Sequence, residues 1–595
     1  MFFYTKIANH LPLSCFINIK TNQYLHGVNF RNFSLKNKNF FLNNIESIYH
    51  EMPYNFESLD VDTATNNFTN WCISIADKYF PLCSKKVGMR RIKAPWLCKS
   101  AIKCLNLKTK LYFQCKRGEI CYEMYFLFSE ILKRLLKLAK EQYYRKLFSN
   151  NKKSSKKTWN NINTLVTGGK DCDARFQIKK NGNLISSPIE IANEFNEYFL
   201  NIPTDLYQKL TPSKNDYSYL IDKNPHSIFF QPATTLEVFN IINSIKSKSS
   251  LHDIPIKMLQ LSDVFSYGIS ELFNHIISCG VYPKKLKIAT VIPIYKSGSK
   301  FDLKNYRPIS LLPVLDKIFE RLILTRLLSF LNKFNIISER QFGFLSGSNT
   351  DIAMLDILSH VIPSFKDNEF AIAIFADLSR AFDCVFRDLL LKKLNFYGIR
   401  GIVLSLLKSF LSDRFQHVLI DSVLSSLGEV KFGVPQGSSL GPLMFLLYVN
   451  DLPKLFTSLI KCILYADDTT LVCKGSNLDM ICQSLSSFMT LFVDWLRFNK
   501  LTLNVSKTKF MLFTSKKSFP KPIISIDNIP LDLVQNHKYL GITFDSKLNY
   551  SKHISQIKGK LSMFISITNI PIYTNFYINK SFFCTLPIKF LRTLI

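Results

Sequence analysis

Two adjacent carboxylates, Asp467 and Asp468, lie between two short apolar runs, Cys462–Leu464 before them and Leu471–Cys473 after them. This pattern predicts a β-hairpin that exposes charge at its turn. Most Asp-Asp turns are only solvated loops, because Asp is a common turn residue. This turn constrains the chain further because Asp377 ends another apolar run upstream. Three converging carboxylates are what a two-metal phosphoryl-transfer site requires.

Asp377 follows the apolar segment Ala371–Ala376, which is typical of a buried strand. A carboxylate at the end of such a strand is costly unless a partner or a metal compensates it. Taken alone, Asp377 could equally be the N-cap of a helix after it. Beside Asp467 and Asp468, an ion-binding role becomes the stronger interpretation, and an all-Asp ligand set favours Mg²⁺.

The net charge of +32 over 595 residues is the main bulk property of the chain. The length predicts several domains, and 47% hydrophobic residues suffice for their cores. A basic surplus of this size indicates a polyanionic partner, nucleic acid in preference to an anionic membrane. No apolar run approaches the ~18–20 residues of a membrane span, and the start does not resemble a signal peptide. We therefore expect a protein of the cytoplasm and nucleus with no membrane association.

The 14 cysteines are scattered and form no Cys-x-x-Cys pair. Their mostly apolar neighbours indicate reduced core residues, and the spacing argues against a zinc module.

The N-terminal half is expected to be mostly short elements and basic helices. Residues 1 to about 55 suggest short strands and loops, while Lys85–Lys157 carries 21 Lys or Arg and 4 Asp or Glu. Apolar residues recur with a helical period in Glu130–Phe148. This helix is either a solvated amphipathic helix or a nucleic-acid-binding face, since aromatic residues alternate with its cations. Asn150–Lys157 is predicted to be a flexible linker, and Pro188–Phe199 a further helix.

From about Pro283 strand-like and helical runs alternate, which favours an α+β antiparallel sheet backed by helices. The predicted helix Asp316–Asn335 is amphipathic. The predicted strands are Ala289–Tyr295, Ala371–Ala376, Ile463–Tyr465 and Phe510–Thr514. A dense Gly/Pro turn, Val434–Pro442, leads into the apolar helix Leu443–Val449. Basic residues around Lys296 and Arg307 could meet a triphosphate or, more simply, face solvent.

An ordered series of motifs then resembles the reverse transcriptase of non-LTR (LINE-type) retrotransposons, most closely the Jockey/CR1 group. The series covers about residues 275–545 and agrees in order, spacing and content. Its members are Ile292–Lys296, Asn305–Ser310, Gln341–Phe344, Phe375–Asp383, Pro435–Pro442 with Asn450–Pro453, Tyr465–Asp468, Leu503–Thr508 and Tyr539–Gly541.

This resemblance implies a right-hand polymerase fold of the α+β class, with fingers, palm and a partial thumb preceded by a mostly helical basic linker. The implied divisions are an endonuclease remnant at 1–50, a linker at 51–240, fingers at 241–370, a palm at 371–545 and an incomplete thumb at 546–595. Ala8–Pro12 resembles a motif near the end of the endonuclease, but Ala8 and Asn9 depart from it. Trp159–Ile162 and Ile191–Phe199 resemble the family's linker.

The resemblance also implies roles for individual residues in RNA-templated addition of dNTPs to a DNA primer. Asp377, Asp467 and Asp468 would hold two Mg²⁺ ions, with Mn²⁺ as an alternative. Phe382 would lie under the nucleotide sugar and exclude a 2′-hydroxyl. The remaining implied contacts are Gln436 and Gly437 at the nascent base pair, Lys296 and Arg307 at the triphosphate, and Lys507 as proton donor to the pyrophosphate. The protein would associate with its element's RNA as a ribonucleoprotein.

Two alternatives stay open beside the polymerase. The first is a non-catalytic nucleic-acid-binding remnant, motivated by the expected truncation at both ends and by Phe344–Thr350, which lacks the family's usual basic residues. The second is a membrane-surface protein, which rests on charge alone.

Overall fold

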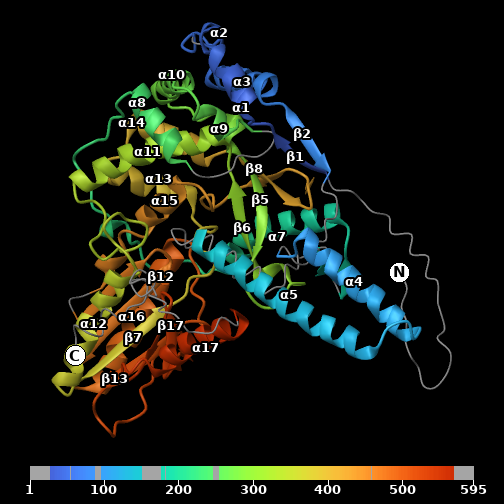
Figure 1. Ribbon diagram of the computed structural model, residues 1–595. Helices are drawn as coiled ribbons and strands as arrows, with labels where there is room; N and C mark the ends of the chain where they lie inside the picture. Colours follow the sequence, from blue (N-terminus) through green and yellow to red (C-terminus); the bar gives the residue numbers. More distant parts are fainter. Residues whose placement is uncertain are drawn as a thin grey trace. The chain divides into compact units, whose positions relative to one another are not determined.

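The computed structural model describes residues 27–53, 55–86, 96–150, 176–180, 182–245, 253–456 and 459–568. Ala8–Pro12, the basic linker beyond Asn150, Trp159–Ile162 and the end of the expected thumb lie outside these residues. The chain divides into two units, Met1–Phe41 with Asp77–Lys140, and Leu42–Ala76 with Glu141–Ile595. Figure 1 shows the elements of both.

The first unit contains a two-stranded sheet and long basic helices. β1 (Gly27–Arg31) pairs antiparallel with β2 (Leu82–Lys86). α4 (Lys99–Lys116) and most of α5 (Tyr122–Asn150) follow. α5 confirms the helix expected at Glu130–Phe148 and begins earlier. Several of its apolar side chains are exposed, including Leu127, Ile131, Leu135 and Leu138.

The expectation of short strands and loops up to about residue 55 is confirmed only in part, by the short strand β1. α1 (Leu35–Asn43) and α2 (Ile45–His50) occupy most of the described part of this segment. The Ser34 hydroxyl accepts a hydrogen bond from the Asn37 N–H, which caps the start of α1. Phe41 is completely buried and packs edge-on against Tyr79. Burial of the apolar residues in this segment thus outweighs the turn preference of its many asparagines.

The second unit holds most of the helices and sheets. Its helices are α2, most of α3 (Val61–Tyr79), α7 (Pro188–Gln208), α8 (Thr235–Ser244), α9 (Ile256–Leu259), α10 (Val264–Cys279), α11 (Val314–Lys333), α12 (Thr350–Lys366), α13 (Arg387–Phe396), α14 (Gly401–Leu411), α15 (Leu440–Tyr448), α16 (Leu478–Phe498) and α17 (Ser551–Thr568). Its strands are β3 (Ile178–Lys180), β4 (Asn183–Ile185), β5 (Ile288–Tyr295), β6 (Tyr306–Leu311), β7 (Phe370–Ala376), β8 (Arg414–Ile420), β9 (Val423–Leu424), β10 (Gly428–Val430), β11 (Ile460–Tyr465), β12 (Asp468–Gly475), β13 (Lys509–Thr514), β14 (Ser525–Ile526), β15 (Ile529–Pro530), β16 (Asp532–Leu533), β17 (Asn536–Tyr539) and β18 (Ile542–Asp545).

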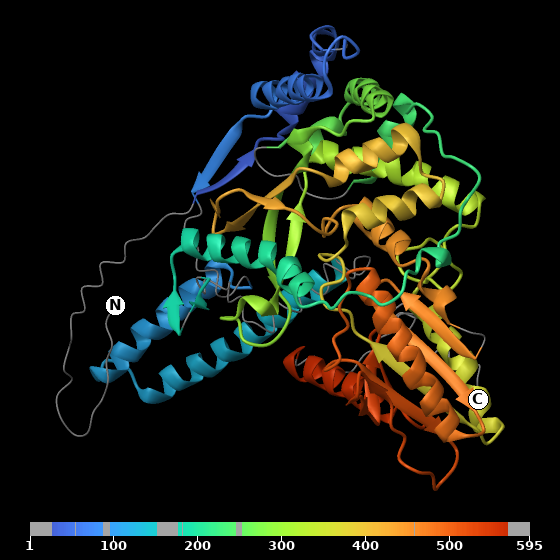
Figure 2. The ribbon, with the colours of Figure 1, turned by 180° about the vertical axis from the view of Figure 1, so that it is seen from behind.

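One five-stranded sheet, the β7 sheet, has the order β11-β12-β7-β13-β16. All its pairs are antiparallel except β13 with β16. Every residue of β7 is buried, as expected of a central strand covered on both faces. α12 packs on one face, where Ile357 and Val361 join Ala373 and Phe375 in one apolar cluster. Figure 2 shows β7, α12 and α16 gathered in the same part of the unit.

A second sheet, the β5 sheet, follows the order β10-β8-β5-β6, with β9 paired to β8. β5 and β6 form an antiparallel hairpin, whereas β5 and β8 are parallel. α7 covers this sheet, and its Ile191 and Phe195 pack with Val291 and Val418. The expectation of helices and sheets in one mixed fold is confirmed, but a second sheet with a parallel pair was not foreseen.

The four predicted strands and the helices at 188–199, 316–335 and 443–449 are all present, with shifted ends. Among the described residues no helix combines the length and the apolar character needed to cross a membrane.

Candidate functional site

The acidic turn is a two-residue hairpin loop. β11 and β12 pair in register from Ile460 opposite Cys473 to Tyr465 opposite Asp468, which leaves Ala466 and Asp467 at the tip. The predicted hairpin is therefore confirmed. Ala466 adopts a left-handed backbone with φ 58°, a conformation that non-glycine residues rarely hold without support from their surroundings.

Gln341 supplies that support. Its side chain is buried, and its Oε1 accepts hydrogen bonds from the Gly343 N–H at 2.8 Å and the Ala466 N–H at 3.1 Å. Its neighbours exchange backbone hydrogen bonds with Leu464, so this segment lies alongside β11. A Cβ on Gly343 would lie 2.5 Å from the Ala466 nitrogen, so only glycine fits there. The motif Gln341–Phe344 thus braces the acidic turn, a role that no local sequence pattern indicated.

Asp377 lies next to this turn because of strand register. Ala376 pairs with Thr469. Asp377 follows Ala376 and Asp468 precedes Thr469, so Asp377 and Asp468 are neighbours at the same end of the sheet. The Asp377 backbone is tied down by the Asn504 N–H, which donates to its carbonyl at 2.8 Å. Residues 381–384 form a turn and the next helix begins at Arg387, so the alternative of Asp377 as a helix N-cap is wrong.

Asp467 and Asp468 have raised pKa values. The pKa of Asp468 is raised to about 6 by burial, together with the charges of Asp467 and Asp377 and against the opposing charges of Lys296 and Arg307. Burial likewise raises the pKa of Asp467. Burial, reinforced by neighbouring carboxylates, therefore disfavours the ionised forms of these two acids unless a cation compensates them.

Three cations surround these acids. Lys507 Nζ lies 3.7 Å from Asp377 Oδ2, and both side chains are partly open to solvent. The β5–β6 hairpin brings Lys296 and Arg307 together, since the Lys296 N–H donates to the Asn305 carbonyl at 2.9 Å. Burial lowers the pKa of Lys296, as do Arg307 and Lys507, while Asp377 raises it. All three cations thus act on the same acidic cluster.

The cluster of Asp377, Asp467 and Asp468 does not form a complete set of metal ligands in this geometry. The described residues contain no group of three or more His, Cys, Asp or Glu side chains placed to hold an ion together. Its chemistry nevertheless suits a hard dication, because its donors are all carboxylate oxygens. A bound cation would offset the burial and the repulsion that raise the pKa values of Asp467 and Asp468.

Phe382 lies in an aromatic group beside the acidic cluster. Its ring stacks on Phe445 of α15 with centroids 4.5 Å apart and meets Phe344 edge-on at 6.2 Å. Phe344 is 61% exposed, so this aromatic group is open on one side. The ring of Phe382 is therefore fixed by packing on the helix that follows the Gly/Pro turn.

The turn at Pro435–Pro442, called here the PQG loop, is fixed to β6 and to Asp383. The Ser310 N–H donates to the Gln436 carbonyl at 2.8 Å, and Gln436 Nε2 donates to Asp383 Oδ1 at 2.7 Å. Gly437 has φ 110°, and a Cβ there would lie 2.6 Å from the Ser310 carbonyl oxygen. Burial raises the pKa of Asp383 to about 6. Asp383 ends the motif Phe375–Asp383, but its contact with Gln436 was not predicted.

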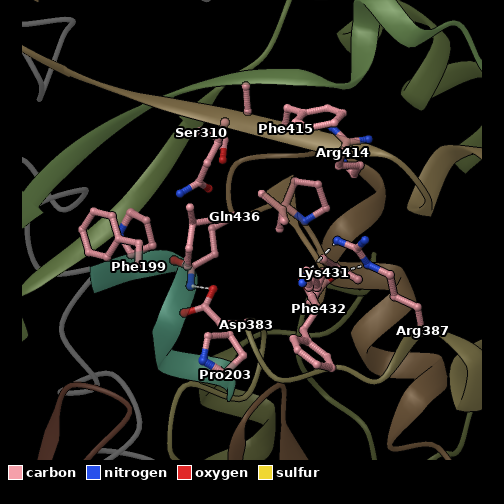
Figure 3. A pocket seen from close by; sticks show the side chains of 18 residues that line it. Phe199, Pro203, Ser310, Asp383, Arg387, Arg414, Phe415, Lys431, Phe432 and Gln436 are labelled. Atoms are coloured by element: carbon pink, nitrogen blue, oxygen red, sulfur yellow. Dashed lines mark hydrogen bonds between the residues drawn. The ribbon is translucent and has the colours of Figure 1, made fainter. Parts of the chain in front are cut away.

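A pocket adjoins this loop, and Figure 3 shows Gln436 and Asp383 turned toward each other at its edge. Phe199 and Pro203 of α7 line one side, and Arg414 with Phe415 of β8 another. Arg387 also lines the pocket and donates to the Gly433 and Phe432 carbonyls, both at 3.1 Å.

Residues 294–544 match the family model of reverse transcriptase (RNA-dependent DNA polymerase), and this range contains all nine predicted site residues. Residues 294–544 form a reverse transcriptase domain. The family expected from the motif series is confirmed for this part of the chain.

Relatives of the reverse transcriptase domain come from insect mobile elements. The probable RNA-directed DNA polymerase from transposon X-element of Drosophila melanogaster is 32% identical over 340 residues, which cover 56% of this chain and 37% of that protein. The RNA-directed DNA polymerase from mobile element jockey of the same species is 31% identical over 352 residues, covering 57% and 38%. The chain thus spans less than two fifths of the length of these relatives.

A solved structure of telomerase from Candida tropicalis, in complex with a fragment of telomeric RNA, is also similar. The match has a TM-score of 0.32 and 12% identity and covers 45% of each chain, which is too distant to support an argument.

Proposed function

We propose that this chain is an RNA-directed DNA polymerase that adds dNTPs to a DNA primer on an RNA template. The observation that carries the proposal is the meeting of Asp377, Asp467 and Asp468 at one end of the β7 sheet, faced by three cations. Phosphoryl transfer depends almost entirely on positioning and on charge stabilisation, and this arrangement offers both signs of charge.

Asp377, Asp467 and Asp468 would hold two Mg²⁺ ions, with Mn²⁺ as the alternative. Bound there, the ions would act as Lewis acids toward the primer 3′-hydroxyl and the departing pyrophosphate. The chain's own part is to keep the carboxylates together, which it does through the register of β7 with β12 and through Gln341.

The cations would bind the phosphates. Lys296 and Arg307 lie on one hairpin and would contact the triphosphate of the incoming nucleotide. Lys507 is 65% exposed, and its ammonium group would donate a proton to the pyrophosphate as it leaves.

Phe382, Gln436 and Gly437 would select the substrate. Phe382 is fixed by Phe445, so its ring would resist displacement by a ribose 2′-hydroxyl. Gln436 and Gly437 would contact the nascent base pair from the PQG loop.

We further propose the right-hand division of this chain, with fingers at 241–370, a palm at 371–545 and thumb residues at 546–595. Residues 51–240 would be the basic linker, residues 1–50 would belong to the end of an endonuclease domain, and the element RNA would be the partner in a ribonucleoprotein. The basic α4 and α5 support nucleic-acid binding by the linker.

The test uses the full chain with Mg²⁺, an RNA template, a DNA primer and dNTPs. The wild type should extend the primer, and the double variant Asp467→Asn/Asp468→Asn should not. Asp421→Asn is the matched control because Asp421 is exposed in a left-handed turn position that Asn also tolerates. RNA binding without extension would instead support the non-catalytic remnant. Extension that survives the double change would refute the site.

A further inference from the structure

Two buried carboxylates lie one helical turn apart on α11. Asp316 and Glu320 are both completely buried in a helix whose other buried residues are mostly apolar. Burying two like charges side by side is strongly unfavourable unless hydrogen bonds and a countercharge offset the cost. The partners of these two acids therefore indicate what the arrangement does.

Glu320 binds the PQG loop with both oxygens. Its Oε1 accepts from the Ser438 hydroxyl at 2.6 Å, and its Oε2 accepts from the Ser439 N–H at 2.5 Å. The Ser438 oxygen accepts in turn from the Leu440 and Gly441 N–H groups at 3.1 and 3.0 Å. These N–H groups begin α15, where the helix offers them no internal partner.

The hydrogen-bond geometry around Glu320 fits its ionised form. The Ser438 oxygen already accepts two N–H bonds, so its single proton must be donated to Glu320. The second Glu320 oxygen faces an N–H donor as well. A protonated carboxyl group or a glutamine amide would therefore set a donor against a donor in this site.

The charges around Glu320 set how readily it ionises. Burial and the neighbouring Asp316 raise its pKa, while Arg414 at the start of β8 lowers it. Asp316 accepts a hydrogen bond from the buried Tyr282 hydroxyl. Burial raises the pKa of Asp316, as does Asp253, while Arg414 and Lys317 lower it. Asp316 thus belongs to the same charge group as Glu320, but its side chain is hydrogen-bonded to Tyr282 and not to the loop.

The loop that Glu320 fixes at Ser438 and Ser439 carries Gln436 and Gly437 on its other arm. That arm is held by Ser310 of β6 and, through the Gln436 side chain, by Asp383. The close approach of Gly441 to the Pro435 carbonyl makes the loop a tight turn, so a shift at one arm must move the other.

We propose that the Glu320 carboxylate is a positioning residue that sets the PQG loop for the nascent base pair by binding Ser438 and Ser439. This inference rests on the proposed polymerase function. Glu320 contacts no substrate itself, and protonating it releases the loop.

The test is single-nucleotide incorporation by the full chain over pH 6 to 9. Glu320→Gln should lower kcat/KM for the dNTP by about tenfold, mostly through KM, because one charge-assisted anchor is lost. In the wild type kcat/KM should rise as Glu320 ionises, and the glutamine variant should lack this rise. Ser438→Ala should have a similar effect, and combining it with Glu320→Gln should add little.

Asp316→Asn is the matched control, equally buried and one turn away. At high pH this variant should have a KM for the dNTP near that of the wild type. Its rise in kcat/KM should occur at lower pH, because the negative charge that repels the Glu320 carboxylate is gone. A fall in kcat at unchanged KM in Glu320→Gln, or an unaltered pH profile, would overturn the positioning role.

Amide hydrogen exchange separates this inference from the polymerase proposal. Ser439, Leu440 and Gly441 should exchange faster in Glu320→Gln than in Asp316→Asn, whether or not the chain extends primers. Equal exchange in the two variants would refute the anchor. Faster exchange without extension by the wild type would refute the polymerase function and retain the anchor.

Discussion

Replacing Gln341 by Met should release the acidic turn. Met has nearly the volume of Gln but no acceptor oxygen, so the Gly343 and Ala466 N–H groups lose their shared partner. A buried donor left without an acceptor costs about 1–3 kcal/mol, and here two are affected. Because a hairpin tip can relax toward water, we expect about 2–4 kcal/mol of lost local stability.

Amide hydrogen exchange at Gly343 and Ala466 measures this loss directly. A cost of about 2–4 kcal/mol corresponds to exchange that is roughly 30- to 1,000-fold faster. Gln341→Glu keeps an acceptor oxygen and should retain most of the protection, while its charge raises the pKa values of Asp467 and Asp468 further. Gln483→Met, on the exposed face of α16, is the control for the substitution itself.

Two outcomes would refute this reasoning. Unchanged exchange at Ala466 in Gln341→Met would mean that the side chain does not brace the turn. Equal acceleration in Gln341→Glu and Gln341→Met would mean that shape, not the acceptor oxygen, matters.

Three further predictions concern the same site. Asp383→Ala and Gln436→Ala should each raise the KM for dNTPs. If Asp383 acts only through Gln436, the double variant should have the same KM as Gln436→Ala, which a double-mutant cycle measures. Because the folded-state pKa of Asp468 is raised to about 6, the free energy of unfolding should fall as pH rises from about 4 to 6. Asp468→Asn should remove this fall. In thermal denaturation at pH 8 the variant should be more stable than the wild type by on the order of 1 kcal/mol, a value that allows for solvent screening. Phe382→Val should reduce discrimination against ribonucleotides by on the order of tenfold or more in competitive incorporation assays, and unchanged discrimination would exclude Phe382 as the selecting ring.

The local elements could be predicted because each depends on neighbours in the sequence. The acidic hairpin follows from two apolar runs around a two-residue tip, and α11 from its apolar period. The approach of Asp377 to Asp468 was expected from their places at the ends of apolar runs and from the resemblance, and the register of β7 with β12 now accounts for it.

Contacts across long sequence separations could not be predicted in the same way. Gln341 and Ala466 are 125 residues apart, and Glu320 and Ser438 are 118 apart. In the sequence, Glu320 has the appearance of an ordinary charged residue on an amphipathic helix. Only the packing of α11 against α15 buries it and gives it partners.

The position of β7 has a consequence for synthesis of the chain. Its sequence, Phe370–Ala376, consists only of Phe, Ala and Ile, and both its neighbours, β12 and β13, are translated later. β13 ends 138 residues after β7 ends (514 − 376). At about 5–20 residues per second, roughly 7 to 28 s pass before both edges of β7 can be paired. During that interval β7 is an apolar strand with at least one open edge, because β12 is translated before β13. Such a strand is a site for aggregation, so slow elongation or a bound chaperone should strongly affect the yield of folded protein.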